Sequence, residues 1–221
     1  MLRPSRISRQ PGRPAVSAGQ LLAAVLAALA LGGCGQLGRG TRLEGRSPTP
    51  ARDVGEVVLP EVRPGEPDRP FAFRATPGHL LYVYFGYASC PDVCPTTLSD
   101  LHKALELLGA DAARVEVAFV TVDLNRDSAQ ILVPYLASFV RGGHALRAPN
   151  QEQLGHAEAA FAATSTVTKS LQGEIQVSHT ALSYLVDERG RIVDQWDFGT
   201  SAKDLAHDLR LLLAQTGDSR R

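Results

Sequence analysis

Cysteine and methionine are scarce in this sequence, and their scarcity limits the metal chemistry that the chain can support. Only three cysteines (Cys34, Cys90 and Cys94) occur among 221 residues, and the one methionine is residue 1. The body of the chain therefore offers no thioether sulfur as a ligand. Any site for a soft metal ion must use cysteine thiolates and histidine imidazoles.

The chain also has no net charge, but its basic and acidic residues are unevenly distributed along the sequence. The chain has 23 basic and 23 acidic residues, and residues 1–33 contain four arginines and no acidic residue. The rest of the chain thus carries 19 basic against 23 acidic side chains. Because nucleic-acid binding needs a basic surface, this balance argues against nucleic acid as a partner.

The apolar run near the N-terminus, Leu21–Leu31, is too short to span a bilayer. Its eleven residues would extend about 16 Å as a helix, roughly half of a hydrocarbon core. Basic residues precede the run, and Leu31-Gly32-Gly33-Cys34 ends it like a bacterial lipobox. We therefore predict that residues 1–33 are a lipoprotein-type signal peptide and that lipidated Cys34 anchors the protein outside the cytoplasm, most simply on the outer face of the cytoplasmic membrane. The alternative is an ordinary signal, or an uncleaved anchor, that happens to contain Cys34.

Composition and hydrophobic periodicity divide the remainder of the chain. We expect a flexible tether at residues 34–52, a folded domain at 53–215 and a disordered tail at 216–221. The predicted strands are 54–59, 71–73, 80–85, 115–122, 145–147, 180–186 and 191–196, and the predicted helices are 95–109, 127–140, 150–163 and one that Ser201 caps. Residues 164–176 are polar and are expected to be irregular. This order predicts an α/β domain with a mixed central sheet flanked by helices, which is a thioredoxin-like arrangement.

Two local signals place helix starts inside this domain. Asp127 and Gln130 have the spacing of a capping box, which predicts that Asp127 caps the second helix. Asn150 has the position of an N-cap for the third helix.

Cys90 and Cys94 lie where the first buried strand gives way to a helix, and three interpretations of them compete. The first is a structural disulfide or a pair of buried thiols, although a bridge over so short a loop stabilises little. The second is a redox pair, because Cys94 lies at a helix N-terminus, which favours the thiolate. The third is a metal site, since two thiolates and an imidazole suit copper, whereas structural zinc usually takes four protein ligands.

A histidine at the same edge of the sheet would complete such a metal site. His179 is the candidate, because it stands just before a predicted strand and follows a segment that can fold over the cysteine loop. The other five histidines lie in turns or on helices, where solvent exposure is the simpler interpretation. Position alone leaves the role of His179 open.

Three sequence blocks in the domain resemble those of the Sco/SenC family. The blocks are FGYASCPDVCPTTL at residues 85–98, VTVD at 120–123 followed by Arg126 and Asp127, and His179 followed by YLVD at 184–187 and Gly190. The match covers residues 53–215, and its first block is highly specific.

The resemblance implies a membrane-tethered, thioredoxin-fold copper protein that assists assembly of the binuclear copper centre of cytochrome c oxidase. It implies that Cys90, Cys94 and His179 bind one copper ion, as Cu(I) or Cu(II), and that Asp123 lies near the site without being a ligand. It also implies subunit II of the oxidase, or another copper chaperone, as the partner. Asp123 has an alternative interpretation as a carboxylate that caps a helix.

The sequence departs from the family pattern at two places. Residues 123–127 read Asp-Leu-Asn-Arg-Asp instead of the usual Asp-Pro-Glu-Arg-Asp, and Ser178 stands where an acidic residue often precedes the ligand histidine. The missing acid bears on the orientation and the pKa of His179.

Two rival functions share the same cysteines. A thiol–disulfide reductase that keeps the cysteines of the oxidase copper site reduced would need Cys90 and Cys94 but not His179. A redox or copper sensor would need an effector region, and the sequence shows no separate domain for one. We therefore predict an extracytoplasmic copper metallochaperone rather than an enzyme.

Overall fold

The computed structural model describes residues 42–218. The predicted signal peptide (1–33) and Cys34 lie outside the described residues. The strands are β1 (Val58–Glu61), β2 (Arg69–Ala72), β3 (Leu80–Gly86), β4 (Val115–Thr121), β5 (His144–Leu146), β6 (Ser165–Lys169), β7 (Ile175–His179), β8 (Ser183–Val186) and β9 (Ile192–Trp196). The helices are α2 (Val93–Leu108), the 3-10 helix η1 (Gly109–Arg114), α3 (Ala129–Ala137), α4 (Gln151–Phe161) and α5 (Ala202–Asp218). Within this part of the chain, no helix is both long and apolar enough to cross a membrane.

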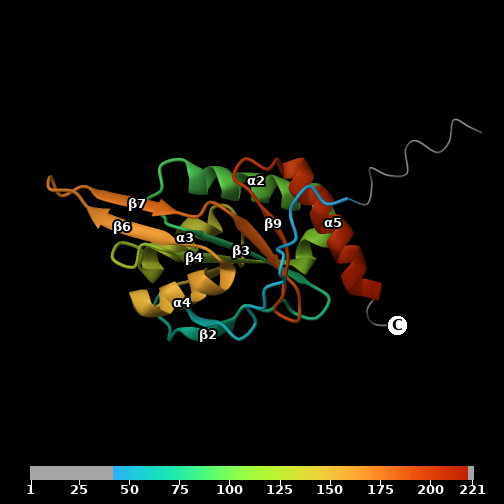
Figure 1. The fold of residues 1–221 in the computed structure, drawn as a ribbon, viewed down its shortest axis with the longest axis horizontal. Coiled ribbons are helices and arrows are strands. Elements are labelled where there is room, and N and C mark those ends of the chain that lie inside the picture. Colours follow the sequence, from blue (N-terminus) through green and yellow to red (C-terminus); the bar gives the residue numbers. More distant parts are fainter. Residues whose placement is uncertain (1–41, 219–221) are drawn as a thin grey trace, which may run out of the picture. The chain divides into compact units, whose positions relative to one another are not determined.

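A mixed sheet forms the centre of the domain, as the sequence predicts. Its seven strands run in the order β2-β1-β5-β4-β3-β8-β9. Strands β3, β4 and β5 are parallel to one another. On one side β8 pairs antiparallel with β3 and β9 antiparallel with β8, and on the other side β1 pairs antiparallel with β5 and β2 antiparallel with β1. Helices α2 and α5 pack together on one face, and α4 lies on the opposite face (Figure 1). The α/β fold class is therefore confirmed.

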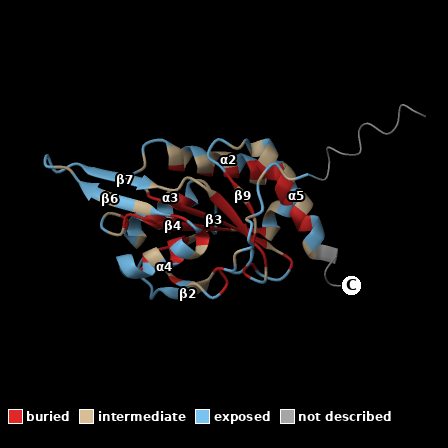
Figure 2. Ribbon diagram, viewed as in Figure 1, coloured by how far each residue is buried: buried red, intermediate tan, exposed pale blue. Residues whose placement is uncertain are grey.

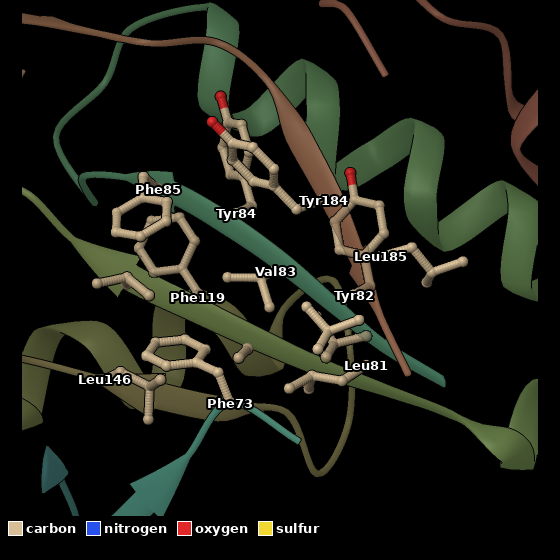
Figure 3. Close-up of a cluster of buried hydrophobic side chains, with 14 of the residues drawn as sticks. Phe73, Leu81, Tyr82, Val83, Tyr84, Phe85, Phe119, Leu146, Tyr184 and Leu185 are labelled. Carbon is tan, nitrogen blue, oxygen red and sulfur yellow. The ribbon is translucent and has the colours of Figure 1, made fainter. Parts of the chain in front are cut away.

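Strand β3 is the core of the sheet because all seven of its residues are buried. A strand covered on both faces reads as a continuous apolar run, which is the pattern of Leu80–Gly86. Aromatic side chains from β3, β4 and β8 pack against one another across the sheet (Figure 3). Since β3 pairs in parallel with β4, with Gly86 opposite Thr121, the loops that follow these two strands meet at one edge.

The segment at 164–176 is not irregular, so this prediction is wrong. Strands β6 and β7 form a separate antiparallel hairpin that projects from the sheet and is largely exposed (Figure 2). Alternating residues in STVTK and IQVSH are compatible with strands, and Gly173 supplies the positive φ of the turn (+89°). His179 consequently ends β7 instead of heading the next strand.

The start of α3 also differs from the prediction. Ser128 occupies the N-cap position, and the helix ends at Ala137 rather than near Val140. Asp127 does not cap this helix, because its carboxylate binds groups at the end of the sheet. The predicted cap by Asn150 is confirmed, since its side chain accepts a hydrogen bond from the N–H of Gln153.

Part of the expected tether is bound to the domain. The carboxylate of Asp208, which is fully buried, accepts hydrogen bonds from the backbone N–H groups of Glu44 and Gly45. A Cβ at Gly45 would lie 2.4 Å from Oδ1 of Asp194, so only glycine fits at this position. At the other end, α5 continues to Asp218, past the predicted start of the tail.

Buried Asp194 makes the stability of the fold depend on pH. Burial raises the pKa of Asp194 to about 7, and the neighbouring Asp208 adds to the effect. A carboxyl whose pKa is raised on folding stabilises the fold below its unfolded pKa, and this stabilisation is lost as pH rises through 7. We therefore expect Asp194→Asn to match the wild type at pH 4.5 and to exceed its free energy of unfolding by at least about 1 kcal/mol at pH 8.5. Urea unfolding at both pH values tests this, and parallel pH profiles would contradict it.

Candidate metal centre

Cys90, Cys94 and His179 form a cluster at the carboxyl edge of the sheet. One ligand atom from each residue lies within 4.8 Å of the others. The Sγ atom of Cys94 lies 3.5 Å from Nε2 of His179, and both cysteines are free thiols. The cluster includes none of the other five histidines among the described residues. The structure therefore brings together the three residues that the sequence singled out as ligands.

Three different elements carry these ligands. Cys90 lies in the loop after β3, Cys94 is the second residue of α2, and His179 is the last residue of β7. The loop and α2 follow directly from β3, so the two thiols are close for local reasons. The β6–β7 hairpin, which is distant in sequence, supplies the histidine.

Cys94 is fully buried beneath the end of β3. A Cβ at Gly86 would lie 2.9 Å from its Sγ atom and 3.0 Å from the Phe119 ring. The sulfur thus occupies space that only glycine leaves free. Gly86 is a site residue that sequence reasoning missed, although it belongs to the block at residues 85–98.

The ring of His179 is oriented as a metal ligand requires. Its Nδ1 lies 3.0 Å from the carbonyl oxygen of Thr180. A carbonyl can only accept, so Nδ1 carries the proton and the lone pair of Nε2 is directed towards Cys94. Burial lowers the pKa of His179, which favours the neutral ring. The Thr180 carbonyl therefore performs the orienting role for which Ser178, lacking a carboxylate, is unsuited.

The two thiols differ in acidity, with the pKa of Cys90 lowered and that of Cys94 raised. The position of Cys94 at the helix N-terminus had predicted a lowered pKa for Cys94. Burial opposes ionisation of Cys90, but hydrogen bonds from the backbone N–H groups of Cys94 and Asp92 outweigh it and lower its pKa. The N–H of Cys94 lies 3.3 Å from the Cys90 sulfur. Burial, reinforced by Cys90, raises the pKa of Cys94 to about 12. The start of α2 thus favours the thiolate of Cys90, and metal binding must displace a proton from Cys94.

A cavity of about 280 Å³ opens beside the cluster. The cysteine loop lines one side and the end of β7 the other, and both Cys90 and His179 face it. Cys94 is not among the lining residues. A molecule that approaches through the cavity therefore reaches Cys90 and His179 before it reaches Cys94.

Asp123, which the family resemblance places near the site, is not part of the cluster. Its side chain is almost fully buried and pairs with the guanidinium of Arg126. The guanidinium lies 5.8 Å from the centre of the Tyr87 ring. Asp123 is not the N-cap of α3, because Ser128 occupies that position.

Asp127 fastens the cysteine loop to the end of β4. One carboxylate oxygen accepts hydrogen bonds from the N–H of Ala88 (3.0 Å) and from the hydroxyl of Thr121 (2.6 Å). The side chain is buried, and burial raises its pKa. The sequence predicted that Asp127 caps a helix. It could not show the contact with Ala88, because that contact joins two loops that only the sheet brings together.

The donor set fits copper. Two cysteine sulfurs and one neutral imidazole are soft and borderline ligands, which Cu(I) prefers at low coordination number. A structural zinc site usually has four protein ligands. Within residues 42–218 the cluster has three members, so the site suits copper better than structural zinc.

Comparisons with known proteins bear on the family of this chain. The SCO1/SenC family profile matches residues 66–214, more than half of the chain. A SCO2-like protein of Rickettsia prowazekii is 30% identical over 130 residues, which cover 58% of this chain and 63% of that protein. The match thus spans less than two thirds of that relative's length.

Two solved structures resemble the fold. The copper-bound structure of ScoI from Bradyrhizobium japonicum is 26% identical, with a TM-score of 0.58, and the match covers 72% of this chain and 96% of that one. The apo Sco1 structure from Thermus thermophilus is 27% identical, with a TM-score of 0.61 and coverage of 82% and 99%. Together with the family profile, these likenesses show that the chain belongs to the SCO1/SenC family.

Proposed function

We propose that the protein binds one copper ion through Cys90, Cys94 and His179 and delivers it during assembly of the binuclear copper centre of cytochrome c oxidase. The observation that carries the proposal is the approach of two sulfurs and one imidazole nitrogen to within 4.8 Å of one another. The copper-bound ScoI of Bradyrhizobium japonicum, a member of the same family, supports copper as the metal.

The partner is subunit II of the oxidase or another copper chaperone. Transfer proceeds by ligand exchange, in which thiolates of the partner replace those of Cys90 and Cys94. The cavity at Cys90 and His179 is the side from which such a partner gains access. Lipidated Cys34 would hold the protein at the outer face of the cytoplasmic membrane, where it can meet the oxidase.

Replacement of His179 by alanine tests the three-ligand site. We expect the wild-type protein to bind one copper ion and to show Cu(II)–thiolate absorption. His179→Ala should lose this absorption, and its copper affinity should fall at least tenfold. The exposed His156 on α4 provides a matched control, and His156→Ala should behave as the wild type. Metal counting and absorption spectroscopy on the purified proteins give the answer. An unchanged spectrum in His179→Ala would refute the site.

A thiol–disulfide reductase is the second candidate, and one observation favours it. Cys90 is partly exposed with a lowered pKa, while Cys94 is buried with a raised one, which is an arrangement that suits an attacking thiol and a resolving thiol. This function needs both cysteines but not His179. Undiminished reduction of a disulfide substrate by His179→Ala, together with no tight copper binding by the wild type, would favour the reductase.

A further inference from the structure

We propose that Arg126 is a positioning residue of the copper site, which holds Tyr87 against Cys90 and His179 and favours the Cu(I)-loaded form by its charge. The inference rests on the proposed copper site. It gives Asp123 a defined task, which is to hold Arg126 in place.

A buried carboxylate fixes the guanidinium of Arg126. The turn after β4 brings the N–H of Arg126 to 3.3 Å from the backbone oxygen of Asp123 and to 3.3 Å from its Oδ1 atom. The Nε–H of Arg126 donates to Oδ2 of the same carboxylate. The Asp123 side chain is 1% exposed and that of Arg126 is 35% exposed. Because the carboxylate cannot move into solvent, the arginine is held at the rim of the site.

Tyr87 connects this arginine to two of the ligands. The ring of Tyr87 is buried, with the Cζ atom of Arg126 5.8 Å from its centre. The same ring contacts the imidazole of His179 edge-on, with 5.9 Å between centres and 86° between planes. Tyr87 also lines the cavity beside Cys90. Loss of the guanidinium would leave the ring free to shift, and the imidazole would lose a fixed neighbour.

The charge of Arg126 bears on the oxidation state of the metal. Two thiolates and a neutral imidazole give a net charge of −1 with Cu(I) and zero with Cu(II). A nearby cation stabilises the more negative form, and the effect is strong where water is partly excluded. Removal of the charge should therefore weaken Cu(I) binding more than Cu(II) binding.

Arg126→Met removes the charge but keeps a long apolar side chain, and Arg126→Lys keeps the charge without the planar group. We expect Arg126→Met to weaken Cu(I) binding roughly tenfold more than Cu(II) binding, with a lower Cu(II)/Cu(I) reduction potential, and Arg126→Lys to recover part of the difference. Asp123→Asn removes a negative charge from the same ion pair, so it should shift the relative affinity in the opposite direction, towards Cu(I). Arg141, exposed in the loop after α3, is the matched control, and Arg141→Met should leave both affinities unchanged.

Competition titrations with Cu(I) and Cu(II) chelators, and NMR of the imidazole protons in the metal-free protein, measure the two roles. In Arg126→Met the signals of His179 should shift without metal, while those of Arg141→Met should not. Equal changes in the two copper affinities would overturn the charge role, and unchanged metal-free His179 signals would overturn the positioning role. Failure of the wild type to bind copper would instead refute the proposed function, and the metal-free measurement would still decide the positioning role.

Discussion

Gly86→Ala is expected to destabilise the protein by about 2–3 kcal/mol and to reduce copper affinity at least tenfold. The added Cβ would lie 2.9 Å from the Cys94 sulfur, 3.0 Å from the Phe119 ring and 3.1 Å from the Tyr84 ring. All three neighbours are fully buried, so none can move aside into solvent. Relief of the clash must displace either the core rings or the sulfur, and the sulfur is a proposed ligand. Urea unfolding and a copper competition titration measure the two effects.

The matched control for Gly86→Ala is Gly155→Ala. A Cβ at Gly155, inside α4, would meet nothing within 4 Å. Alanine is the better helix former, so this variant should gain roughly 0.5–1 kcal/mol in stability and bind copper as the wild type does. If Gly86→Ala behaved like the control, the tight placement of Cys94 against β3 would be disproved.

Asp127→Ala is expected to cost about 3 kcal/mol and to lower copper affinity. Its carboxylate is the acceptor for the Ala88 N–H and the Thr121 hydroxyl, and its side chain is 1% exposed. Truncation would leave the buried Thr121 hydroxyl and the partly buried Ala88 N–H without this acceptor and detach the cysteine loop from the end of β4. The free energy of unfolding and the copper affinity should therefore fall together.

Asp127→Asn separates this hydrogen-bonding role from the charge. The amide oxygen can accept the same two hydrogen bonds, and burial already raises the pKa of the natural carboxyl. We expect Asp127→Asn to lose less than about 1 kcal/mol and to keep most of the copper affinity. Equal damage by alanine and asparagine would mean that the negative charge, and not the fastening of the loop, is what matters.

Gly86→Ala and Asp127→Ala act on the same feature, which is the edge of the sheet where the loops after β3 and β4 meet. Parallel pairing puts Gly86 opposite Thr121, so the cysteine loop and the loop with Asp123 and Asp127 leave the sheet side by side. Chemistry gathers at this edge because several strand ends converge there. The β6–β7 hairpin then closes the site with His179.

Local sequence was sufficient for most elements of the domain and for the cysteine pair. The apolar run Leu80–Phe85 predicted β3, and the leucine spacing after it predicted α2, because burial and helical periodicity are written directly into neighbouring residues. The two thiols follow from the same local signals. The hairpin was missed because its strands are short, polar and mostly exposed, so they lack the hydrophobic signal on which the prediction depended.

Tertiary structure decided how the site is completed and which thiol ionises more easily. The local sequence around His179 does not show that its ring reaches Cys94. It also does not show that the carbonyl of Thr180 sets the tautomer of the ring. Its position in the helix alone favoured the thiolate at Cys94. In the structure, burial raises the pKa of Cys94, and the backbone N–H groups at the start of α2 donate to the sulfur of Cys90 and lower the pKa of that thiol instead. The sequence therefore determined which residues are candidates for the chemistry. Burial and long-range contacts determined their geometry and acidity, since both depend on neighbours that only folding brings together.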